Sequence, residues 1–301
     1  MRVFVTGGTG LIGSAVVDAL LQGGHRVTVL TRTPAKAEVL RKKGATLHEG
    51  TIQDPQGYTA LAGEHDALLH MAIDYSKDTV QSDRTAIDAL VAAAGRSRPR
   101  LVVYTSGCWV LGTTGDRPAD ESASTDHPAQ AVAWRPAHER LVLSAAGDGL
   151  VTAVVRPGMV YGGAGGMTAQ LFASAVQQQA ASVVGDGTNR WSLVHREDLA
   201  QVYRLVVERG AAGIYHGVDG TPVTVADVGR AASRAVGAKG AIALVPLAEA
   251  RRKLGPIADA ICMDQALAAP RARALGWTPA CASFPDCAAR AFREWRAAHG
   301  E

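Results

Sequence analysis

The turn Thr6-Gly7-Gly8-Thr9-Gly10-Leu11-Ile12-Gly13 limits the possible folds of this chain more than any other segment. It follows the apolar run Val3-Phe4-Val5 and precedes a helical pattern over residues 14–22. In a strand–turn–helix unit, glycines at this spacing allow a tight turn, a close approach of backbone to a pyrophosphate, and close packing of helix on sheet. The free N–H groups at the start of the helix attract the anion. The turn therefore predicts a dinucleotide site, with Gly7, Thr9, Gly10, Leu11, Ile12 and Gly13 as cofactor-binding residues.

Short apolar runs alternate with helical stretches in the first half of the chain. We expect strands at 27–30, 46–48, 67–71, 101–104 and 151–155, and helices at 33–44, 79–94 and 129–146. This alternation predicts an α/β fold, a Rossmann-type doubly wound parallel sheet with helices on both faces.

The pattern changes after Pro157, where helices dominate. We expect helices at 168–181, 196–208, 224–236 and 284–298, with added strands at 214–216 and 242–245. The predicted domains are therefore an NADP-binding Rossmann domain at 1–157 and a smaller, mainly helical C-terminal substrate region at 158–301. Some segments of the second region are expected to return to the first.

The residues that follow the second strand distinguish two cofactors. An NAD site usually has Asp or Glu there to bind the ribose 2′-hydroxyl, but no acidic residue lies between Asp18 and Glu38. Arg32 stands in that place, and its planar guanidinium suits a 2′-phosphate. Lys36 adds a second positive charge. The sequence predicts NADP(H) rather than NAD(H).

Composition excludes several other classes of protein. The chain has 301 residues, of which 47% are hydrophobic, and a formal net charge of +3. These values are globular and give no reason to expect a nucleic-acid partner. The longest uncharged stretch, 157–185, is too rich in glycine and glutamine to span a membrane. Without a signal peptide, we expect a cytoplasmic protein in which Cys108, Cys262, Cys281 and Cys287 are scattered thiols, with no metal site.

At this point the sequence resembles the extended and atypical short-chain dehydrogenase/reductases, the group that contains the NAD-dependent epimerase/dehydratases. The resemblance covers nearly the whole chain. It rests on several motifs in the right order, at residues 6–13, 68–72, 103–107, 155–162, 185–191, 194–200 and 275–279.

The resemblance implies roles for residues at the ends of the strands. Adenine contacts fall on Thr51 and Ile52, and phosphate–ribose contacts on Met71, Ala72 and Ile73. Ser106, with Thr105 as its neighbour, supplies a hydroxyl beside the substrate carbonyl, and Pro157 lies against the nicotinamide. Arg190 either binds a substrate phosphate, as in nucleotide-sugar members, or is a structural ion-pair partner.

One departure from the family concerns its Tyr-x-x-x-Lys pair, in which tyrosine exchanges the proton and lysine binds the nicotinamide ribose. With Glu139 as the anchor of the alignment, the tyrosine falls on Ala131 and the lysine on Arg135. Arg135 can bind ribose hydroxyls but does not titrate near neutrality. The chain therefore resembles the atypical members.

The function expected is that of an NADPH-dependent oxidoreductase acting on a small carbonyl-type substrate. An epimerase/dehydratase-like enzyme and a non-catalytic NADP-binding redox sensor are the alternatives. Ser106 is the first catalytic candidate, and the proton comes from Tyr161, Tyr75 or a bound water. Trp109, Met167 and Arg190 are substrate-pocket candidates. Relatives often form homodimers, and the sequence leaves the oligomeric state open.

Overall fold

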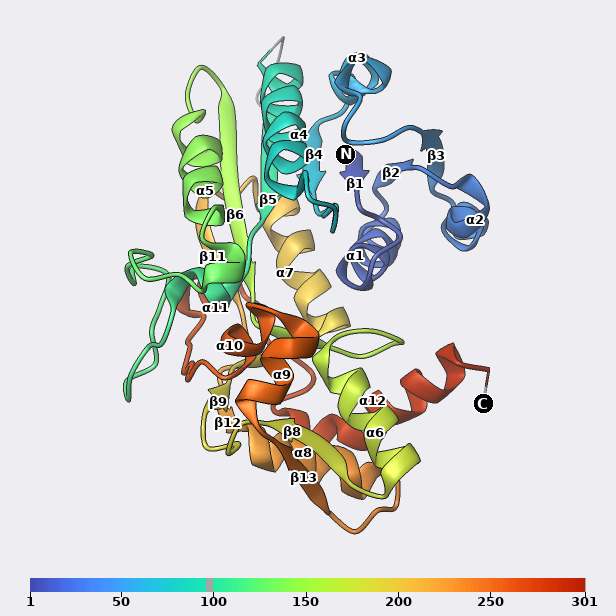
Figure 1. Ribbon diagram of the computed structural model, residues 1–301. Coiled ribbons are helices and arrows are strands. Elements are labelled where there is room, and N and C mark those ends of the chain that lie inside the picture. Colours follow the sequence, from blue (N-terminus) through green and yellow to red (C-terminus); the bar gives the residue numbers. More distant parts are fainter. Residues whose placement is uncertain (96–99, 301) are drawn as a thin grey trace. The chain divides into compact units, whose positions relative to one another are not determined.

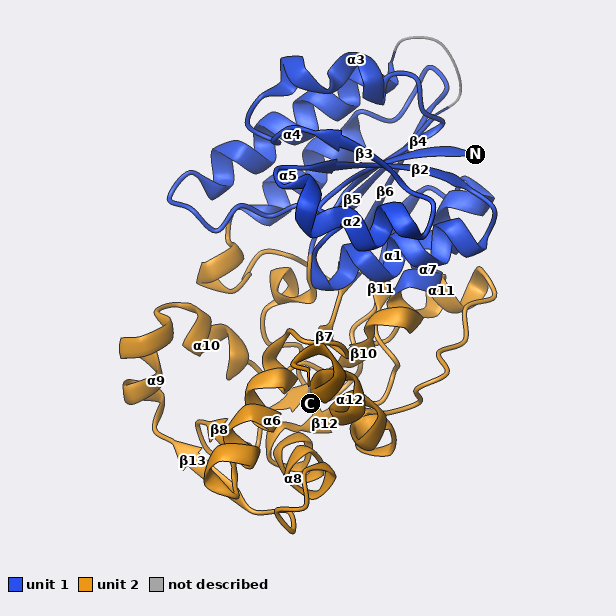
Figure 2. Cartoon of the chain, turned by 90° about the vertical axis from the view of Figure 1, so that its right-hand side faces the viewer, with its two compact units in different colours: residues 1–106, 134–156, 200–215 blue, residues 107–133, 157–199, 216–301 orange. Residues whose placement is uncertain are grey.

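The computed structural model describes residues 1–95 and 100–300 and divides the chain into two compact units (Figure 2). Unit 1 comprises Met1–Ser106, Trp134–Arg156 and Ala200–Tyr215. Unit 2 comprises Gly107–Ala133, Pro157–Leu199 and His216–Glu301. This division differs in two segments from the boundary at residue 157 that the sequence predicts. Segment 107–133 belongs to unit 2, and segment 200–215 belongs to unit 1.

Unit 1 is built on a seven-stranded sheet in the order β11-β6-β5-β4-β1-β2-β3 (Figure 1). The neighbouring pairs among β1 to β6 are parallel, with Val3 opposite Val27 and Ala67. The strands are β1 (Arg2–Thr6), β2 (Arg26–Thr31), β3 (Thr46–Glu49), β4 (Ala67–His70), β5 (Arg100–Thr105), β6 (Leu150–Pro157) and β11 (Gly213–Gly217). The strand order reverses beside β1, which confirms the expected Rossmann-type fold and places the ligand edge at the carboxyl ends of the strands.

Helices cover both faces of this sheet, as the alternating pattern predicts. On one face lie α3 (Thr59–Ala62), α4 (Thr79–Ala94) and α5 (Arg135–Ser144), and on the other α1 (Leu11–Gln22), α2 (Pro34–Lys42) and α7 (Arg196–Arg209) (Figure 2). Short 3-10 turns are η1 (Pro55–Gly57), η2 (Cys108–Leu111) and η3 (Gln130–Val132). Because the inner strands are covered on both faces, they are continuous apolar runs with buried side chains, such as Phe4, Leu68 and Val102.

The single helix expected over 129–146 is wrong in its first part. The segment instead forms η3 and then α5, which begins at Arg135. Pro136 explains the late start, because proline lacks an N–H and has a fixed φ that suits the first turn of a helix.

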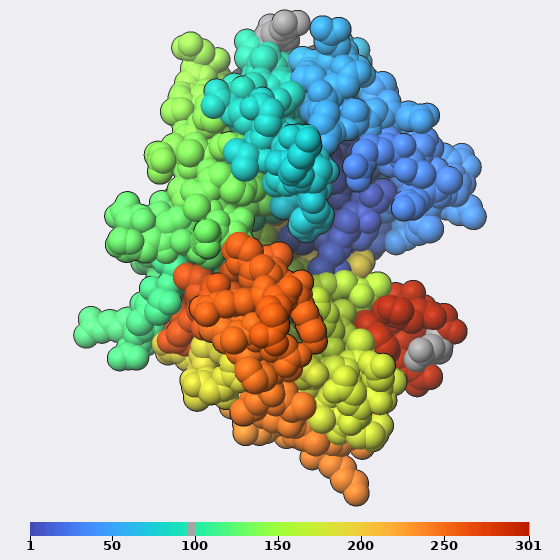
Figure 3. Space-filling model, viewed as in Figure 1, coloured from blue at the N-terminus to red at the C-terminus, as the bar shows by residue number. Residues whose placement is uncertain are grey.

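Unit 2 is mainly helical. Its helices are α6 (Met167–Gln178), α8 (Val225–Ala235), α9 (Leu247–Leu254), α10 (Ile257–Ile261), α11 (Pro270–Ala274) and α12 (Phe284–Ala298). Three two-stranded sheets pair β7 (Met159–Tyr161) with β10 (Leu193–His195), β9 (Arg190–Trp191) with β12 (Val223–Thr224), and β8 (Ala181–Val184) with β13 (Ile242–Val245). Helices α6, α8 and α12 supply much of the core of unit 2. Helix α9, in the orange part of Figure 3, has the exposed side chains Arg251, Arg252 and Lys253.

The expectation of four separate thiols is wrong, because Cys281 and Cys287 form a disulfide. The first turn of α12 brings their Cα atoms to 5.9 Å, within the range that a disulfide spans. Cys108 and Cys262 are free thiols. Among the described residues, no helix is long and apolar enough to cross a membrane.

Candidate functional site

Gly7 and Gly13 of the first turn are required by the fold itself. Gly7 has φ +74°, and a Cβ there would lie 2.4 Å from the amide nitrogen of Ala72. A Cβ on Gly13 would lie 2.1 Å from the carbonyl oxygen of Gly7. The absence of a side chain at both positions lets the turn lie against the end of β4 and lets α1 begin close to the sheet.

Gly10 is different, because neither its backbone nor its packing demands glycine. Its φ of −77° and ψ of 177° suit any residue, and an added Cβ would contact only the carbonyl oxygen of Gly7, at 3.3 Å. Gly10 is also the N-cap of α1, and no side chain caps the helix there. The first N–H groups of α1 and the bare face of Gly10 therefore fit a pyrophosphate. Thr9 is exposed beside them, and Leu11 and Ile12 are half-buried.

Arg32 directly follows β2, and Lys36 lies in the first turn of α2. Both side chains are exposed. Among the described residues, neither has a hydrogen bond or an ion pair, although the charge of Arg32 helps lower the pKa of Asp74, after the hydrogen bonds from Ser76 and Gln53. The two cations are therefore available to an anionic ligand.

The ends of β3 and β4 complete this edge of the sheet. Met71, Ala72 and Ile73 are half-buried after β4, as phosphate–ribose contacts require. After β3, Thr51 is half-buried, whereas the side chain of Ile52 packs in the core and is 8% exposed. Only the backbone of Ile52 remains for contact with an adenine.

A buried network of hydrogen bonds and ion-pair contacts lies beneath the turn, and sequence reasoning missed it. Thr6 Oγ1 lies 2.7 Å from His70 Nδ1 and accepts from the N–H groups of Met71 and Ala72. His70 Nε2 lies 3.3 Å from Asp83 Oδ1. Asp83 Oδ2 lies 2.7 Å from His138 Nδ1. The network joins β1, β4, α4 and α5, which no local sequence pattern could indicate.

Burial opposes the charge of Asp83, but its neighbours outweigh burial. The hydrogen bond with His138, the neighbouring His70 and the charge of Arg135 together hold the pKa of Asp83 well below its usual range. Tyr104 donates its hydroxyl to Asp83 Oδ2 at 2.9 Å, and burial first of all raises the pKa of this phenol. Tyr104 is therefore a fixed donor within unit 1 and is 1% exposed.

Arg135 is the last member of this network. Its Nη1 donates to the Tyr104 hydroxyl at 3.1 Å and to the Thr105 carbonyl at 2.9 Å, and its guanidinium lies 4.6 Å from the centre of the Trp134 ring. These contacts fix the guanidinium at the carboxyl end of β5. The position expected to bind the nicotinamide ribose is thus held in place by contacts within unit 1.

Ser106 comes directly after β5 and is 7% exposed. Among the described residues its Oγ has no hydrogen-bond partner, so it carries a donor that a ligand carbonyl could use. Its neighbour Thr105 shares a hydrogen bond of 2.8 Å with the buried Tyr203 of α7. Tyr75, in the loop after β4, is 87% exposed.

Tyr161 lies in the core of unit 2 and is fully buried. Its ring meets those of His195 and Phe284 edge-on, with centroids 5.2 and 5.0 Å apart. Burial, followed by the charges of Asp219 and Asp198, raises the pKa of its hydroxyl well above the usual value. This enclosure argues against Tyr161 as the proton donor.

Arg190 forms the structural ion pair that was one of its two expected roles. Its Nη2 and Nε lie 2.6 and 2.9 Å from the carboxylate of Asp264, and Nη2 also donates to the carbonyl of Gly115. The pairing lowers the pKa of Asp264, first through the side-chain hydrogen bond. The charge of Arg190 is therefore already balanced within unit 2.

A cavity of about 40 Å³ lies in unit 2, and Trp191, the residue after Arg190, is part of its lining. Its lining contains no charged side chain and consists of Met167, Gln170, Leu171, Ser182, Val183, Val184, Trp191, Val225, Leu254 and Ile261. The Trp191 indole is fixed by donation to the carbonyl of Ile261 at 2.8 Å. Of the expected substrate residues, Met167 lines this cavity, whereas Trp109 packs against the core of unit 2.

Comparison with known proteins agrees with this geometry. Residues 3–217 match the NAD dependent epimerase/dehydratase family. A Saccharomyces cerevisiae protein described as uncharacterized is 29% identical over 290 residues, which cover 93% of this chain and 95% of that protein. The 4-hydroxy-2-methyl-3-oxo-4-farnesyl-3,4-dihydroquinoline-1-oxide ketoreductase of Stigmatella aurantiaca is 29% identical over 264 residues, covering 83% of this chain and 78% of the relative.

The fold itself recurs in solved structures. A human epimerase family protein crystallised with NADPH has a TM-score of 0.77 at 20% identity, and the match covers 97% of this chain and 99% of the human one. The family match over residues 3–217 includes the glycine turn and the strands that follow it. The chain therefore belongs to the NAD dependent epimerase/dehydratase family, among the extended short-chain dehydrogenase/reductases.

Proposed function

We propose that this protein is an NADPH-dependent reductase of a small carbonyl compound. The observation that carries the cofactor preference is the pair of exposed cations, Arg32 directly after β2 and Lys36 in the first turn of α2. The segment has no Asp or Glu to bind a ribose 2′-hydroxyl. A 2′-phosphate has two negative charges that this pair can balance, whereas a 2′-hydroxyl gains little from them.

The reduced nicotinamide supplies a hydride when bound. The chain must then stabilise the negative charge that develops on the carbonyl oxygen and provide a proton. Ser106 Oγ is a suitable donor to that oxygen, because it is buried and unpartnered among the described residues. Arg135 adds a fixed positive charge at the end of β5. With Tyr161 enclosed, the proton comes from a bound water or from the exposed Tyr75.

The substrate is proposed to be uncharged. A nucleotide sugar brings a diphosphate, which needs cations or N–H donors, but Arg190 is held by Asp264 and the cavity lining has no charge. A cavity needs about 10–15 Å³ to hold one water molecule. The cavity of about 40 Å³ is a few times larger and suits a small alkyl group. This observation favours carbonyl reduction over the epimerase/dehydratase alternative.

A second function, binding NADP(H) as a redox sensor without catalysis, is favoured by Ala131. This residue stands where the family has its tyrosine and carries no hydroxyl. The two proposals separate in one assay: a reductase consumes NADPH over many turnovers with some member of a panel of uncharged ketones and aldehydes. A sensor binds NADPH and consumes none.

The cofactor proposal is tested by Arg32→Glu. A carboxylate at this place repels a 2′-phosphate and accepts a 2′-hydroxyl, so NADPH affinity should fall by about tenfold or more, which is about 1.4 kcal/mol. NADH affinity should hold or rise. Fluorescence titration with both nucleotides measures the change. Arg26→Glu, at the exposed start of the same strand, is the matched control. Unchanged NADPH affinity in Arg32→Glu would refute the assignment.

The catalytic proposal is tested by Ser106→Ala. Loss of one oriented donor to a developing oxyanion typically lowers turnover by about 10²–10³-fold. NADPH affinity, measured separately, should change little, because the hydroxyl is assigned to the substrate. A Ser106→Ala enzyme that works at the full rate removes this residue from the mechanism.

A further inference from the structure

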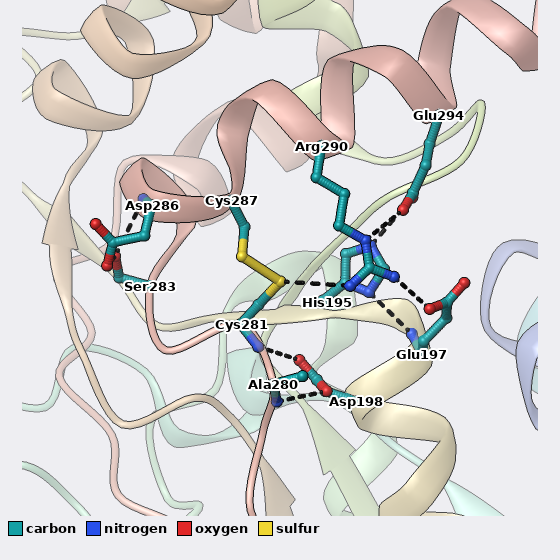
Figure 4. The surroundings of a disulfide bond; sticks show 10 residues. All are labelled: His195, Glu197, Asp198, Ala280, Cys281, Ser283, Asp286, Cys287, Arg290 and Glu294. Carbon is teal, nitrogen blue, oxygen red and sulfur yellow. Dashed lines mark hydrogen bonds and ion pairs between the residues drawn. A yellow bond between two sulfur atoms is a disulfide. The ribbon is translucent and has the colours of Figure 1, made fainter.

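The Cys281–Cys287 disulfide joins a buried cysteine to a half-buried one. Cys281, just before α12, is 1% exposed, whereas Cys287, in the first turn of α12, is half-buried (Figure 4). A thiolate can break a disulfide only by reaching one of its sulfur atoms. Access therefore directs attack to Cys287 Sγ and makes Cys281 the leaving group.

We propose that this disulfide is a thiol–disulfide exchange site that takes a small dithiol as its reductant. Cys287 is the attacked residue and Cys281 is the one released.

The backbone of Cys281 is anchored independently of the disulfide. The N–H groups of Ala280 and Cys281 donate to the two carboxylate oxygens of Asp198, at 2.8 and 2.9 Å (Figure 4). Asp198 belongs to the first turn of α7. When the sulfur–sulfur bond opens, Cys281 therefore stays in place, ready to close it again.

A cation stands beside the released sulfur. Arg290 Nη1 lies 4.0 Å from Cys281 Sγ. Its other nitrogens pair with Glu197 and, at 2.9 Å, with Glu294 Oε1 (Figure 4). A nearby guanidinium stabilises a thiolate, and a more stable thiolate leaves faster.

The other charged groups of this cluster are already occupied. Asp198 carries a negative charge near Cys281, but both its oxygens accept backbone N–H groups. Glu294 Oε2 lies 3.0 Å from His195 Nε2 and accepts from the N–H of Gly163. Although burial opposes ionisation, the His195 and Arg290 partners lower the pKa of Glu294 to about 2. His195 and Asp198 each also place a side-chain atom within 4.8 Å of Cys281 Sγ, and Arg290 is the guanidinium that faces it.

The reaction balances as two exchanges. The first thiolate of the dithiol bonds to Cys287 Sγ, and the electron pair of the broken bond leaves on Cys281. The second thiolate of the reductant then attacks the reductant sulfur that is bonded to Cys287 Sγ, and Cys287 leaves as a thiolate. The N-terminus of α12 stabilises this thiolate. The dithiol becomes a disulfide, and its two electrons and two protons end on Cys281 and Cys287. A small-molecule disulfide reverses the sequence.

Opening the bond should loosen α12 without unfolding it. Phe284, Ala288, Ala291 and Trp295 of this helix lie in the core of unit 2 and keep their contacts. The disulfide closes a short loop, with a sequence separation of 6. Its loss should therefore lower Tm by about 5 °C.

The experiment treats the native full-length protein with dithiothreitol, quenches with iodoacetamide at intervals, and locates alkylated cysteines by peptide mass spectrometry. We expect thiols to appear at Cys281 and Cys287 while circular dichroism remains native. Monothiol glutathione should leave a mixed disulfide on Cys287. Cys262→Ser, which removes another half-buried thiol of unit 2, should react as the parent does.

Variants of Arg290 test the role of the cation. Arg290→Gln should slow the exchange by about two- to tenfold, because the leaving thiolate loses its cation, and Arg290→Lys should restore most of the rate. The proposal is overturned by four free thiols in the oxidised protein, by reduction only after unfolding, by glutathione on Cys281, or by an unchanged rate in a folded Arg290→Gln variant. If the Arg290→Gln variant does not fold, the proposal is still tested by whether glutathione is found on Cys287 or on Cys281 of the parent protein.

Discussion

Gly10 and Gly13 lie three residues apart in one turn, yet a side chain is excluded at them for different reasons. An added Cβ at Gly13 would lie 2.1 Å from the Gly7 carbonyl oxygen, which the fold cannot accept. At Gly10 the corresponding distance is 3.3 Å and the backbone is extended. The fold therefore does not require glycine at position 10, whereas the proposed phosphate contact does.

The two alanine variants should separate binding from stability. Gly13→Ala should lower the free energy of unfolding by about 1–3 kcal/mol, as overpacking does. Gly10→Ala should change stability by less than about 1 kcal/mol but weaken NADPH binding by about tenfold or more, because its methyl group occupies phosphate space. Chemical denaturation and nucleotide titration measure the two effects. A Gly10→Ala protein that binds NADPH like the parent would contradict this account of the turn.

The positions of individual residues were predictable from the sequence where local structure sets them. The glycine turn and Arg32 each lie directly after a strand, so the pattern of strand, turn and helix locates them. The buried network was not predictable, because Thr6, His70, Asp83 and His138 come from four different elements. The enclosure of Tyr161 was hidden for the same reason: His195 and Phe284 approach it only after unit 2 has folded.

At the scale of elements, α5 is held on the sheet by a buried ion pair. Glu139 of α5 and Arg156 of β6 are each 3% exposed, with Glu139 Oε2 at 2.6 Å from Arg156 Nη2 and Oε1 at 3.0 Å from Nε. The sequence located the strands of the seven-stranded sheet and most helices because their periodicity is strong, but it missed the short strands β7, β8, β9, β10 and β12 of unit 2. It could not show this pairing, and it placed the start of α5 too early.

Glu139→Ala should lower the free energy of unfolding by about 3–5 kcal/mol, since it leaves the buried charge of Arg156 without its carboxylate. Replacing both residues with methionine should recover much of that loss, because neither charge is then buried. Arg140→Ala, on the exposed face of the same helix, should stay within about 0.5 kcal/mol. Urea unfolding of the four proteins gives the comparison. A loss of under about 1 kcal/mol in Glu139→Ala would show that the pair does not hold α5.

At the scale of the whole molecule, stability should depend on one buried carboxyl group of unit 2. Asp219 is 4% exposed, and burial raises its pKa from 3.8 to about 7. Its Oδ1 accepts from the N–H of Thr221 at 2.8 Å, whereas among the described residues Oδ2 has no hydrogen-bond partner. The folded chain therefore holds a proton that the unfolded chain releases near pH 4.

This contribution is fully present below about pH 4 and is lost as pH rises through about 7. Asp219→Asn stays neutral, keeps the acceptor for Thr221, and should remove this pH dependence. At pH 8 it should be more stable than the parent by up to about 4 kcal/mol, from a pKa difference of about three units. Thermal denaturation from pH 4 to 8 measures it, with the exposed Asp116→Asn as control. Parallel pH profiles for parent and Asp219→Asn would count against a protonated Asp219.

The chain passes between its two units after residues 106, 133, 156, 199 and 215. No single cut in the gene can therefore release either unit whole. During synthesis on the ribosome, β6 emerges well before its neighbour β11, and residues 157–199 of the other unit are made in between. Until β11 arrives, the nascent sheet has an unpaired apolar edge at β6, the kind of edge to which other chains add. The newborn chain thus has an interval in which a chaperone bound to this edge would protect it.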